Sequence, residues 1–115
     1  MAKARKKLLS ISYDEPLLVT RHMLLKQAGY DVTSAAGFTE ALEHQSEKFD
    51  LILIGHSVPP KDKSALIAQL SKHYRAPLLS IRRHGDEPIP EADFSVDAHD
   101  GPEALLREVH KALAG

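Results

Sequence analysis

The chain has 115 residues, 43% of them hydrophobic and 27% charged, which is enough for one hydrophobic core and too little for a second domain. The net charge of −1 provides no overall field to attract nucleic acid or an anionic membrane, although residues 3–7 (KARKK) are locally basic. The absence of cysteine and of any long apolar run excludes a disulfide framework, a thiolate metal site and a transmembrane helix. We therefore expect one domain over residues 1–115 in the cytoplasm, with residues 1–6 as a disordered basic start.

Short apolar runs alternate with amphipathic runs along the chain, a pattern typical of strands and helices that build a parallel sheet. In chain order we predict a strand at 7–12, a helix from Asp14 to near Gly29, a strand at 31–35, a helix at 38–47, a strand at 50–55, a helix at 63–74, strands at 77–82 and 93–97, and a last helix after Asp100. The first helix is marked by Asp14, whose carboxylate can cap free backbone N–H groups, and by Pro16 in the first turn. The last is marked by Asp100 and Glu103 at the spacing of a capping box.

The segment between the fourth and fifth strands, residues 83–92, is the least regular in the chain. It contains two prolines and a glycine and hardly any apolar periodicity, and each proline removes a backbone donor and disfavours helix in the residue before it. We predict that the helix usually found between parallel strands is short or missing here. Leu79, Ile81 and Ile89 would then lose cover and be available for burial by a partner.

Six segments of the chain, in order and spacing, resemble the receiver domain of bacterial two-component response regulators. They are YDEPLL (13–18), LLKQAGYDV (24–32), EAL (40–42), DLILIGHSVPP (50–60), APLLSI (76–81) and DGPEALLREV (100–109). The first resembles the acidic turn after the first strand, and the fourth resembles the third strand with its proline-rich loop. The resemblance implies an α/β fold, a flavodoxin-like three-layer sandwich with a five-stranded parallel sheet of order 2-1-3-4-5.

In that family the third strand ends in an aspartate that accepts a phosphoryl group from a histidine kinase. Two acidic residues after the first strand help to hold Mg²⁺, a Ser or Thr ends the fourth strand, and a Lys ends the fifth; the cations offset the negative charge that accumulates as the carboxylate attacks. Here Gly55 stands at the phosphoacceptor position, and neither Ile54 before it nor His56, Ser57 and Val58 after it offers a carboxylate. The resemblance therefore implies a receiver without its nucleophile.

The other positions of the phosphorylation site also depart from the family's pattern. Tyr13 replaces the first acidic residue, whereas Asp14 retains the second. Arg82 stands at the Ser or Thr position and Ala98 at the Lys position, and no lysine occurs anywhere in residues 73–110. The degenerate pocket predicted from the sequence comprises Tyr13, Asp14, Gly55, His56, Arg82 and Ala98.

Three features of this degenerate pocket have alternative interpretations. Asp14, His56 and His99 could all lie at the carboxyl edge of the sheet and hold a transition metal, but seven histidines in 115 residues place some near acids by accident, and we expect no metal site. Arg82 either pairs with Asp14 as a constitutive clamp, in place of metal and lysine, or is a solvated arginine at a strand end. Tyr13 either plugs the pocket with its ring or points outward.

The sequence predicts a pseudo-receiver: a cytoplasmic signalling domain of a response regulator that binds protein partners without aspartyl phosphorylation, is not an enzyme and needs no cofactor. The partner could be a histidine kinase, an output domain or a second copy of the chain, the last through the face of the fourth and fifth strands; neither nucleic acid nor membrane is expected to bind directly. The alternative is a small ligand-binding or anion-binding domain that uses the crevice at the carboxyl edge of the sheet, where Arg82, Arg83 and His84 could attract an anion.

Overall fold

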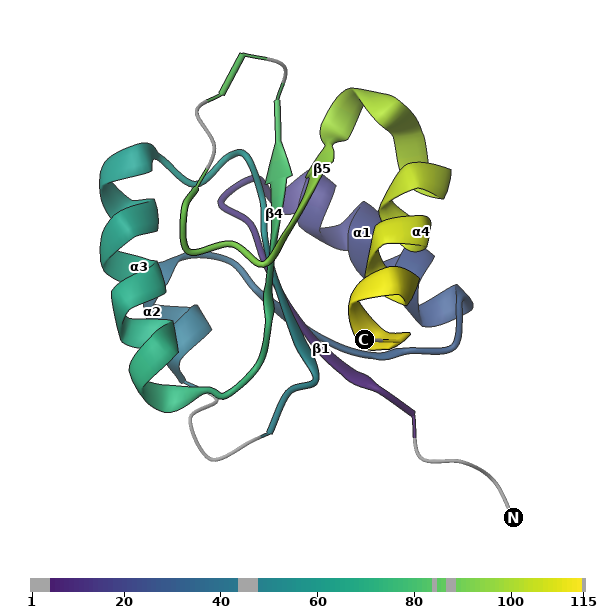
Figure 1. The fold of residues 1–115 in the computed structure, drawn as a ribbon, viewed down its shortest axis with the longest axis horizontal. Helices are drawn as coiled ribbons and strands as arrows, with labels where there is room; N and C mark the ends of the chain where they lie inside the picture. The colour runs from purple at the N-terminus through teal and green to yellow at the C-terminus, as the bar shows by residue number, and fades with distance from the viewer. Residues whose placement is uncertain (1–4, 44–47, 84, 87–88, 115) are drawn as a thin grey trace.

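A computed structural model describes residues 5–43, 48–83, 85–86 and 89–114. These residues form a five-stranded parallel sheet of order β2-β1-β3-β4-β5 with helices on both faces (Figure 1). The strands are β1 (Lys7–Ile11), β2 (Asp31–Ala35), β3 (Leu51–Ile54), β4 (Leu78–Arg82) and β5 (Phe94–Asp97). The helices are α1 (Glu15–Gln27), α2 (Phe38–Leu42), α3 (Pro60–His73), the single 3₁₀ turn η1 (Ala98–Asp100) and α4 (Gly101–Ala114). The predicted fold class and strand order are confirmed.

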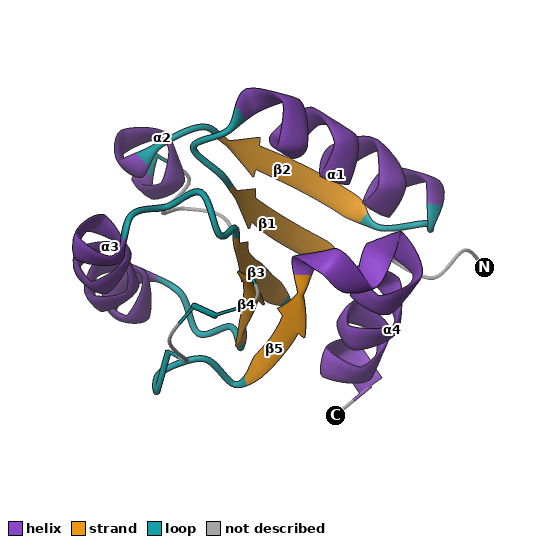
Figure 2. Ribbon diagram, turned by 90° about the horizontal axis from the view of Figure 1, so that it is seen from above, coloured by secondary structure: helices purple, strands orange, loops and turns teal. Residues whose placement is uncertain are grey.

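The sheet separates two hydrophobic cores, because successive side chains of a strand point to opposite faces. Figure 2 shows α2 and α3 on one face of the sheet and α1 and α4 on the other. The α3-side core includes Leu9, Ile11, Ile52, Ile54, Leu66 and Leu70. The α4-side core includes Leu8, Leu51, Leu53, Leu79, Leu105 and Val109. All four residues of β3 are buried, which explains its unbroken apolar sequence, and each such side chain contributes about 1.5–3 kcal/mol on burial.

The helix starts follow local signals in the sequence. Asp14 caps α1 as predicted, its Oδ1 accepting from the Leu17 N–H at 3.2 Å. Helix α3 starts at Pro60, three residues before the predicted start at 63, because a proline in the first turn needs no backbone donor and already has a helical φ. Asp97 caps the turn that precedes α4, its Oδ1 accepting from the His99 N–H at 2.8 Å.

Two of the predicted segments lie partly outside the described residues. The second helix is described as Phe38–Leu42, and residues 44–47 of its predicted range are outside. Of the basic start, residues 1–4 are outside, whereas the Lys6 carbonyl accepts a hydrogen bond from the Asp31 N–H at 2.9 Å. This bond joins Lys6, just before β1, to Asp31 at the start of β2. None of the helices in the described ranges is long and apolar enough to cross a membrane.

The connection between β4 and β5 contains no helix in the residues described there, which are 83, 85–86 and 89–93. The prediction of a short or missing helix is confirmed for this part of the connection. Glu87 and Pro88, on which that prediction partly rested, lie outside the described residues, as does His84.

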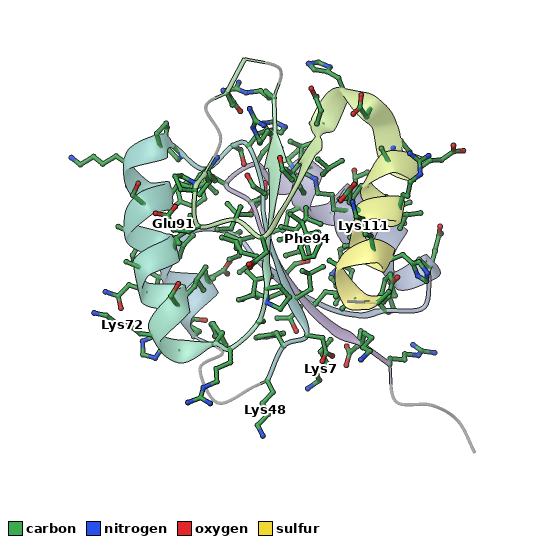
Figure 3. All side chains as sticks on the ribbon, viewed as in Figure 1. Lys7, Lys48, Lys72, Glu91, Phe94 and Lys111 are labelled. Carbon is green, nitrogen blue, oxygen red and sulfur yellow. The ribbon has the colours of Figure 1, made fainter. Side chains whose placement is uncertain are left out.

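Tight turns and one apolar contact organise this connection instead. The Asp86 N–H donates to the Arg83 carbonyl at 3.0 Å, and the Ala92 N–H donates to the Ile89 carbonyl at 3.1 Å. Ile89 is half-buried and packs against the α3-side core. Figure 3 shows Glu91 of this connection beside α3. The loop thus supplies part of the cover that a helix would give.

The prediction that Leu79 and Ile81 need a partner to cover them is wrong. Leu79 is 0% exposed and Ile81 is 3% exposed, because both point into the α4-side core. Side chains that alternate with Leu79 and Ile81 point to the opposite face of the sheet, towards the connection that has no helix in its described residues. Ser80 of β4 lies on that face and pairs with Ser95 of β5 in the strand register. Ser95 is exposed. The face left without a helix is therefore polar at this position and not an apolar patch.

Candidate functional site

Gly55 follows β3 directly and lies in the interior of the carboxyl edge of the sheet. It is buried, and its N–H donates to the Ile11 carbonyl of β1 at 2.9 Å. A Cβ atom at this position would lie 2.7 Å from Nη1 of Arg21 and 3.2 Å from the Ile11 carbonyl oxygen. The first distance is shorter than real Cβ atoms tolerate, so a side chain fits here only if the Arg21 guanidinium moves. An arginine side chain occupies the space beside the position where receivers carry their aspartate.

Arg21 reaches this space from the inner face of α1. It lies three residues after Leu18 and four before Leu25, so all three share one side of the helix, and all three are buried. Arg21 is 8% exposed, and its Nη1 has no hydrogen-bond partner among the described residues. Burial lowers the pKa of Arg21, and the nearby carboxylate of Asp14 partly opposes this effect. Arg21 is not among the site residues predicted from the sequence, although its spacing from two buried leucines indicates that it lies inside.

Two serine hydroxyls join the loop after β1 to the loop after β3. The Oγ atoms of Ser12 and Ser57 are 2.9 Å apart and hydrogen-bonded. Ser57 Oγ also accepts from the Tyr13 N–H at 3.0 Å, and Ser12 Oγ accepts from the Asp14 N–H at 3.1 Å. These bonds fix the backbone of residues 12–14 against the loop that begins at Gly55. Neither serine is among the site residues predicted from the sequence.

Tyr13 neither fills the space beside Gly55 nor points directly to solvent. Its hydroxyl donates to Oδ2 of Asp62 on α3 at 3.2 Å, and its half-buried ring packs against the α3-side core. Burial, followed by the charge of Asp62 and the hydrogen bond to it, raises the pKa of Tyr13. Tyr13 therefore links the loop after β1 to α3.

The predicted pair between Arg82 and Asp14 is not present. Nη2 of Arg82 donates to the backbone carbonyl of Asp86, in the loop between β4 and β5, while Nε is buried and has no hydrogen-bond partner in the described part of the chain. The Asp86 carboxylate accepts from the Arg83 N–H at 2.8 Å and lies 3.9 Å from Arg83 Nε. The backbone hydrogen bond from Arg83 is the main cause that lowers the pKa of Asp86. Because this loop contains no helix in its described part, its turn is free to fold over the end of β4 and offer Arg82 a nearby acceptor.

The structure does not support the metal alternative. Within the described ranges, no group of three or more His, Asp or Glu side chains is placed to hold a metal ion. Asp14 is exposed and uses Oδ1 to cap α1, and His99 lies in η1, after β5. The two histidines and the carboxylate therefore form no ligand set.

His56 and Ala98 both line a cavity between α1 and α4, and His56 also lines a second cavity beside the start of α3. Burial is the main cause that lowers the pKa of His56, followed by the charges of Arg21 and Arg83. Its Nδ1 is buried and has no hydrogen-bond partner among the described residues. Ala98 packs against the α4-side core and offers no charged group. The cation beside Gly55 is Arg21 of α1. The family's pattern has no cation at that position of the first helix.

No protein-family model matches the chain, and no curated protein sequence matches it. Solved structures do match. The chain is similar to chemotaxis protein CheY4 of Vibrio cholerae, with 25% identity, a TM-score of 0.72, and coverage of 96% of this chain and 100% of that one.

Two further similarities extend over nearly the whole chain. The N-terminal domain of a response regulator/sensory box/GGDEF three-domain protein from Carboxydothermus hydrogenoformans is 22% identical, with a TM-score of 0.81 and coverage of 95% of this chain and 94% of that one. A CheY-like receiver domain from Methylobacillus flagellatus is 16% identical, with a TM-score of 0.80 and coverage of 95% and 99%. Together with the strand order, these similarities establish that the chain has the fold of response regulator receiver domains.

Proposed function

We propose that this protein is a pseudo-receiver: a cytoplasmic signalling domain of the response regulator type that acts through protein contacts, without aspartyl phosphorylation and without catalytic activity of its own. The observation that carries the proposal is the guanidinium of Arg21, whose Nη1 would be 2.7 Å from a Cβ at position 55. A phosphorylation site at this edge needs a carboxylate nucleophile and room for Mg²⁺ and three phosphoryl oxygens. Here the position of the nucleophile is occupied by Gly55, and the guanidinium of Arg21 fills the adjoining space.

The remaining positions of the site support the same proposal. Ala98 provides no cation to bind a phosphoryl oxygen, and Arg82 is bonded to the Asp86 carbonyl. The loops after β1 and β3 are joined directly by Ser12 and Ser57, 2.9 Å apart. In a functional receiver a metal ion and a phosphoryl group bring such loops together, whereas in this protein neutral hydroxyls do so.

The alternative of an anion-binding crevice around Arg82, Arg83 and His84 is not favoured. Arg82 and Arg83 both bind Asp86 of the same loop. Each guanidinium therefore already has a contact within this loop: Arg83 lies near the Asp86 carboxylate, and Arg82 donates to the neutral Asp86 backbone carbonyl. His84 lies outside the described residues.

Phosphoryl donors should leave the protein unmodified. After incubation with acetyl phosphate and Mg²⁺, intact-protein mass spectrometry should detect no added phosphoryl group, because no carboxylate stands at the end of β3. A receiver that retains its aspartate serves as the positive control in the same buffer. A phosphoryl adduct mapped by peptide sequencing to a carboxylate of residues 12–15 or 50–62 would contradict the proposal.

The partner contact is proposed to lie at the open edge of β5, with a second copy of the chain as one occupant. β5 ends the sheet order, so one side of its backbone has no neighbouring strand, and such edges pair readily with other chains. Phe94 at the start of β5 is half-buried (Figure 3), and Ser95 next to it is exposed. The polar character of this face favours a contact made through the backbone edge over one made through a large apolar patch.

Sedimentation velocity measures this contact directly. We expect a reversible dimer, and we expect Ser95→Glu to weaken it by at least about tenfold, because like charges on neighbouring strands repel. Thr39→Glu is the matched control, since it adds the same charge to the exposed surface of α2 near the opposite edge of the sheet. A protein that stays monomeric at high concentration, or a dimer that Thr39→Glu weakens equally, would rule out this surface.

A further inference from the structure

A cavity of about 450 Å³ lies between α1 and α4, next to the carboxyl ends of β4 and β5. Its walls are mainly apolar and include Leu17, Leu24, Ile81, Val96 and Leu105. Cavities that bind small molecules usually have volumes of about 300–1,000 Å³ and combine apolar walls with a few polar groups. The size and lining of this cavity are therefore those of a small-molecule site.

The polar part of the cavity contains two permanent cations, Arg21 and Arg83, and two histidines, His56 and His99. Arg83 lies 3.9 Å from the Asp86 carboxylate, and burial lowers the pKa of His56, which favours its neutral form. Arg21 therefore supplies the charge for a ligand, and Asp97 is the acidic residue among the described residues of the lining. Asp97 is engaged in local structure, because its Oδ1 accepts the His99 N–H at 2.8 Å. The charge balance of the lining therefore favours an anion.

Two buried nitrogen atoms at this end of the cavity have no hydrogen-bond partner among the described residues. They are Nη1 of Arg21 and Nδ1 of His56. Arg21 is more than nine-tenths buried, with 8% of its surface exposed, and a buried guanidinium donor without an acceptor is costly and rare. Nη1 itself lies beside Gly55 and is closed to the cavity in this structure, so a ligand would bind the guanidinium after it turns towards the cavity. An acceptor oxygen of that ligand would then satisfy a donor that the described residues leave without a partner.

We propose that this cavity binds a small organic carboxylate with an apolar ring or chain. The carboxylate pairs with Arg21 and reaches towards His56, while the apolar part lies against Leu24, Val96 and Leu105. The apolar walls argue for an organic acid over a small inorganic anion, because an inorganic anion would leave those walls in contact with water. This ligand site goes beyond the pseudo-receiver function, since it involves neither phosphorylation chemistry nor the edge of β5, and it shares with that function the guanidinium of Arg21.

A titration of ¹⁵N-labelled protein with 2-naphthoate tests the site, with the neutral isostere 2-naphthamide and inorganic phosphate as separate probes. We expect 2-naphthoate to shift the amide resonances of residues 17–24 and 96–105 saturably. 2-Naphthamide should bind at least about tenfold more weakly, because it lacks the charge that pairs with the guanidinium. Phosphate should produce no saturable shifts in these segments.

Two variants locate the charge that binds the probe. Arg21→Met retains the length of the side chain and should weaken 2-naphthoate binding by at least about tenfold. Arg107→Gln removes a cation from the exposed face of α4, outside the cavity lining, and should leave binding unchanged. If Arg21→Met does not fold, the comparison of naphthoate with naphthamide on the unmodified protein decides alone. Equal binding of the two naphthyl probes, no saturable shift, phosphate binding as tight as that of naphthoate, or full binding by Arg21→Met would each overturn the proposal.

Discussion

Replacing Arg21 with methionine should raise the free energy of unfolding by about 1–3 kcal/mol, the usual cost of a buried donor without a partner. Arg21 is 8% exposed, and its Nη1 has no partner among the described residues, so folding removes this nitrogen of a charged group from water without a hydrogen bond to those residues in return. Methionine keeps an unbranched chain between Leu18 and Leu25 and removes the charge. Replacing buried charges by apolar side chains of similar size is often neutral or stabilising for this reason.

The gain is measured by urea unfolding followed by far-ultraviolet circular dichroism, since the chain contains no tryptophan for fluorescence. Arg107→Met is the matched control on the exposed face of α4 and should change the stability by no more than about 0.5 kcal/mol. A clear loss of stability in Arg21→Met would mean that the attraction between Arg21 and Asp14 outweighs the cost of burial. It would contradict our account of Arg21.

Restoring the aspartate at position 55 should not restore a phosphorylation site. The Cβ of Gly55→Asp would meet Nη1 of Arg21 at 2.7 Å, so the guanidinium must shift, and the new carboxylate then lies beside it as an ion pair. In that ion pair the carboxylate is bound to Arg21 and is not available to attack a phosphoryl group. The lysine of the family's pattern is also still absent, because Ala98 stands at its position. Acetyl phosphate with Mg²⁺ should therefore add no phosphoryl mass to Gly55→Asp.

The stability of the position 55 variants provides a quantitative test of the same contact. Gly55→Ala should destabilise the fold by about 1–3 kcal/mol, because it adds a methyl group to a filled space. Gly55→Asp should destabilise it less, because its carboxylate pairs with Arg21. In a double-mutant cycle with Arg21→Met we expect a coupling energy of at least about 1 kcal/mol for aspartate. An absence of coupling would show that the two positions do not interact.

The fold could be predicted from the sequence because its signals are local and repeat along the chain. Apolar runs mark β1 and β3, Asp14 caps α1 as expected, and the prolines of the segment before β5 correctly indicated that its described residues form no helix. The error in the start of α3 came from treating Pro60 as part of a loop, although a proline also suits the first turn of a helix. These features depend on residues that are close together in the sequence, so they can be recognised from the sequence alone.

The contacts of the candidate site were harder to predict, because they depend on which side chain reaches a shared space. Arg82 was expected to pair with Asp14, but a loop carbonyl from Asp86 lies closer, and loop geometry is not evident from the sequence. Arg21 was overlooked because arginine is rarely buried. The periodicity of α1 nevertheless placed Arg21 between Leu18 and Leu25, on the side that faces the sheet. The burial of Leu79 and Ile81 follows from the alternation of side chains along β4. Both residues face α4, whereas the segment expected to lack a helix would cover the opposite face.

The contact between Ser12 and Ser57 also determines which conditions can change the shape of this edge. Serine hydroxyls are neutral throughout the physiological pH range, so neither protonation nor salt screening acts on the bond between them. This contact between the two loops therefore has no charge through which pH or ionic strength could act on it. Under the proposed function, a domain joined in this way would convey information by how many copies are made and where they assemble, on the timescale of protein synthesis and not of phosphate chemistry.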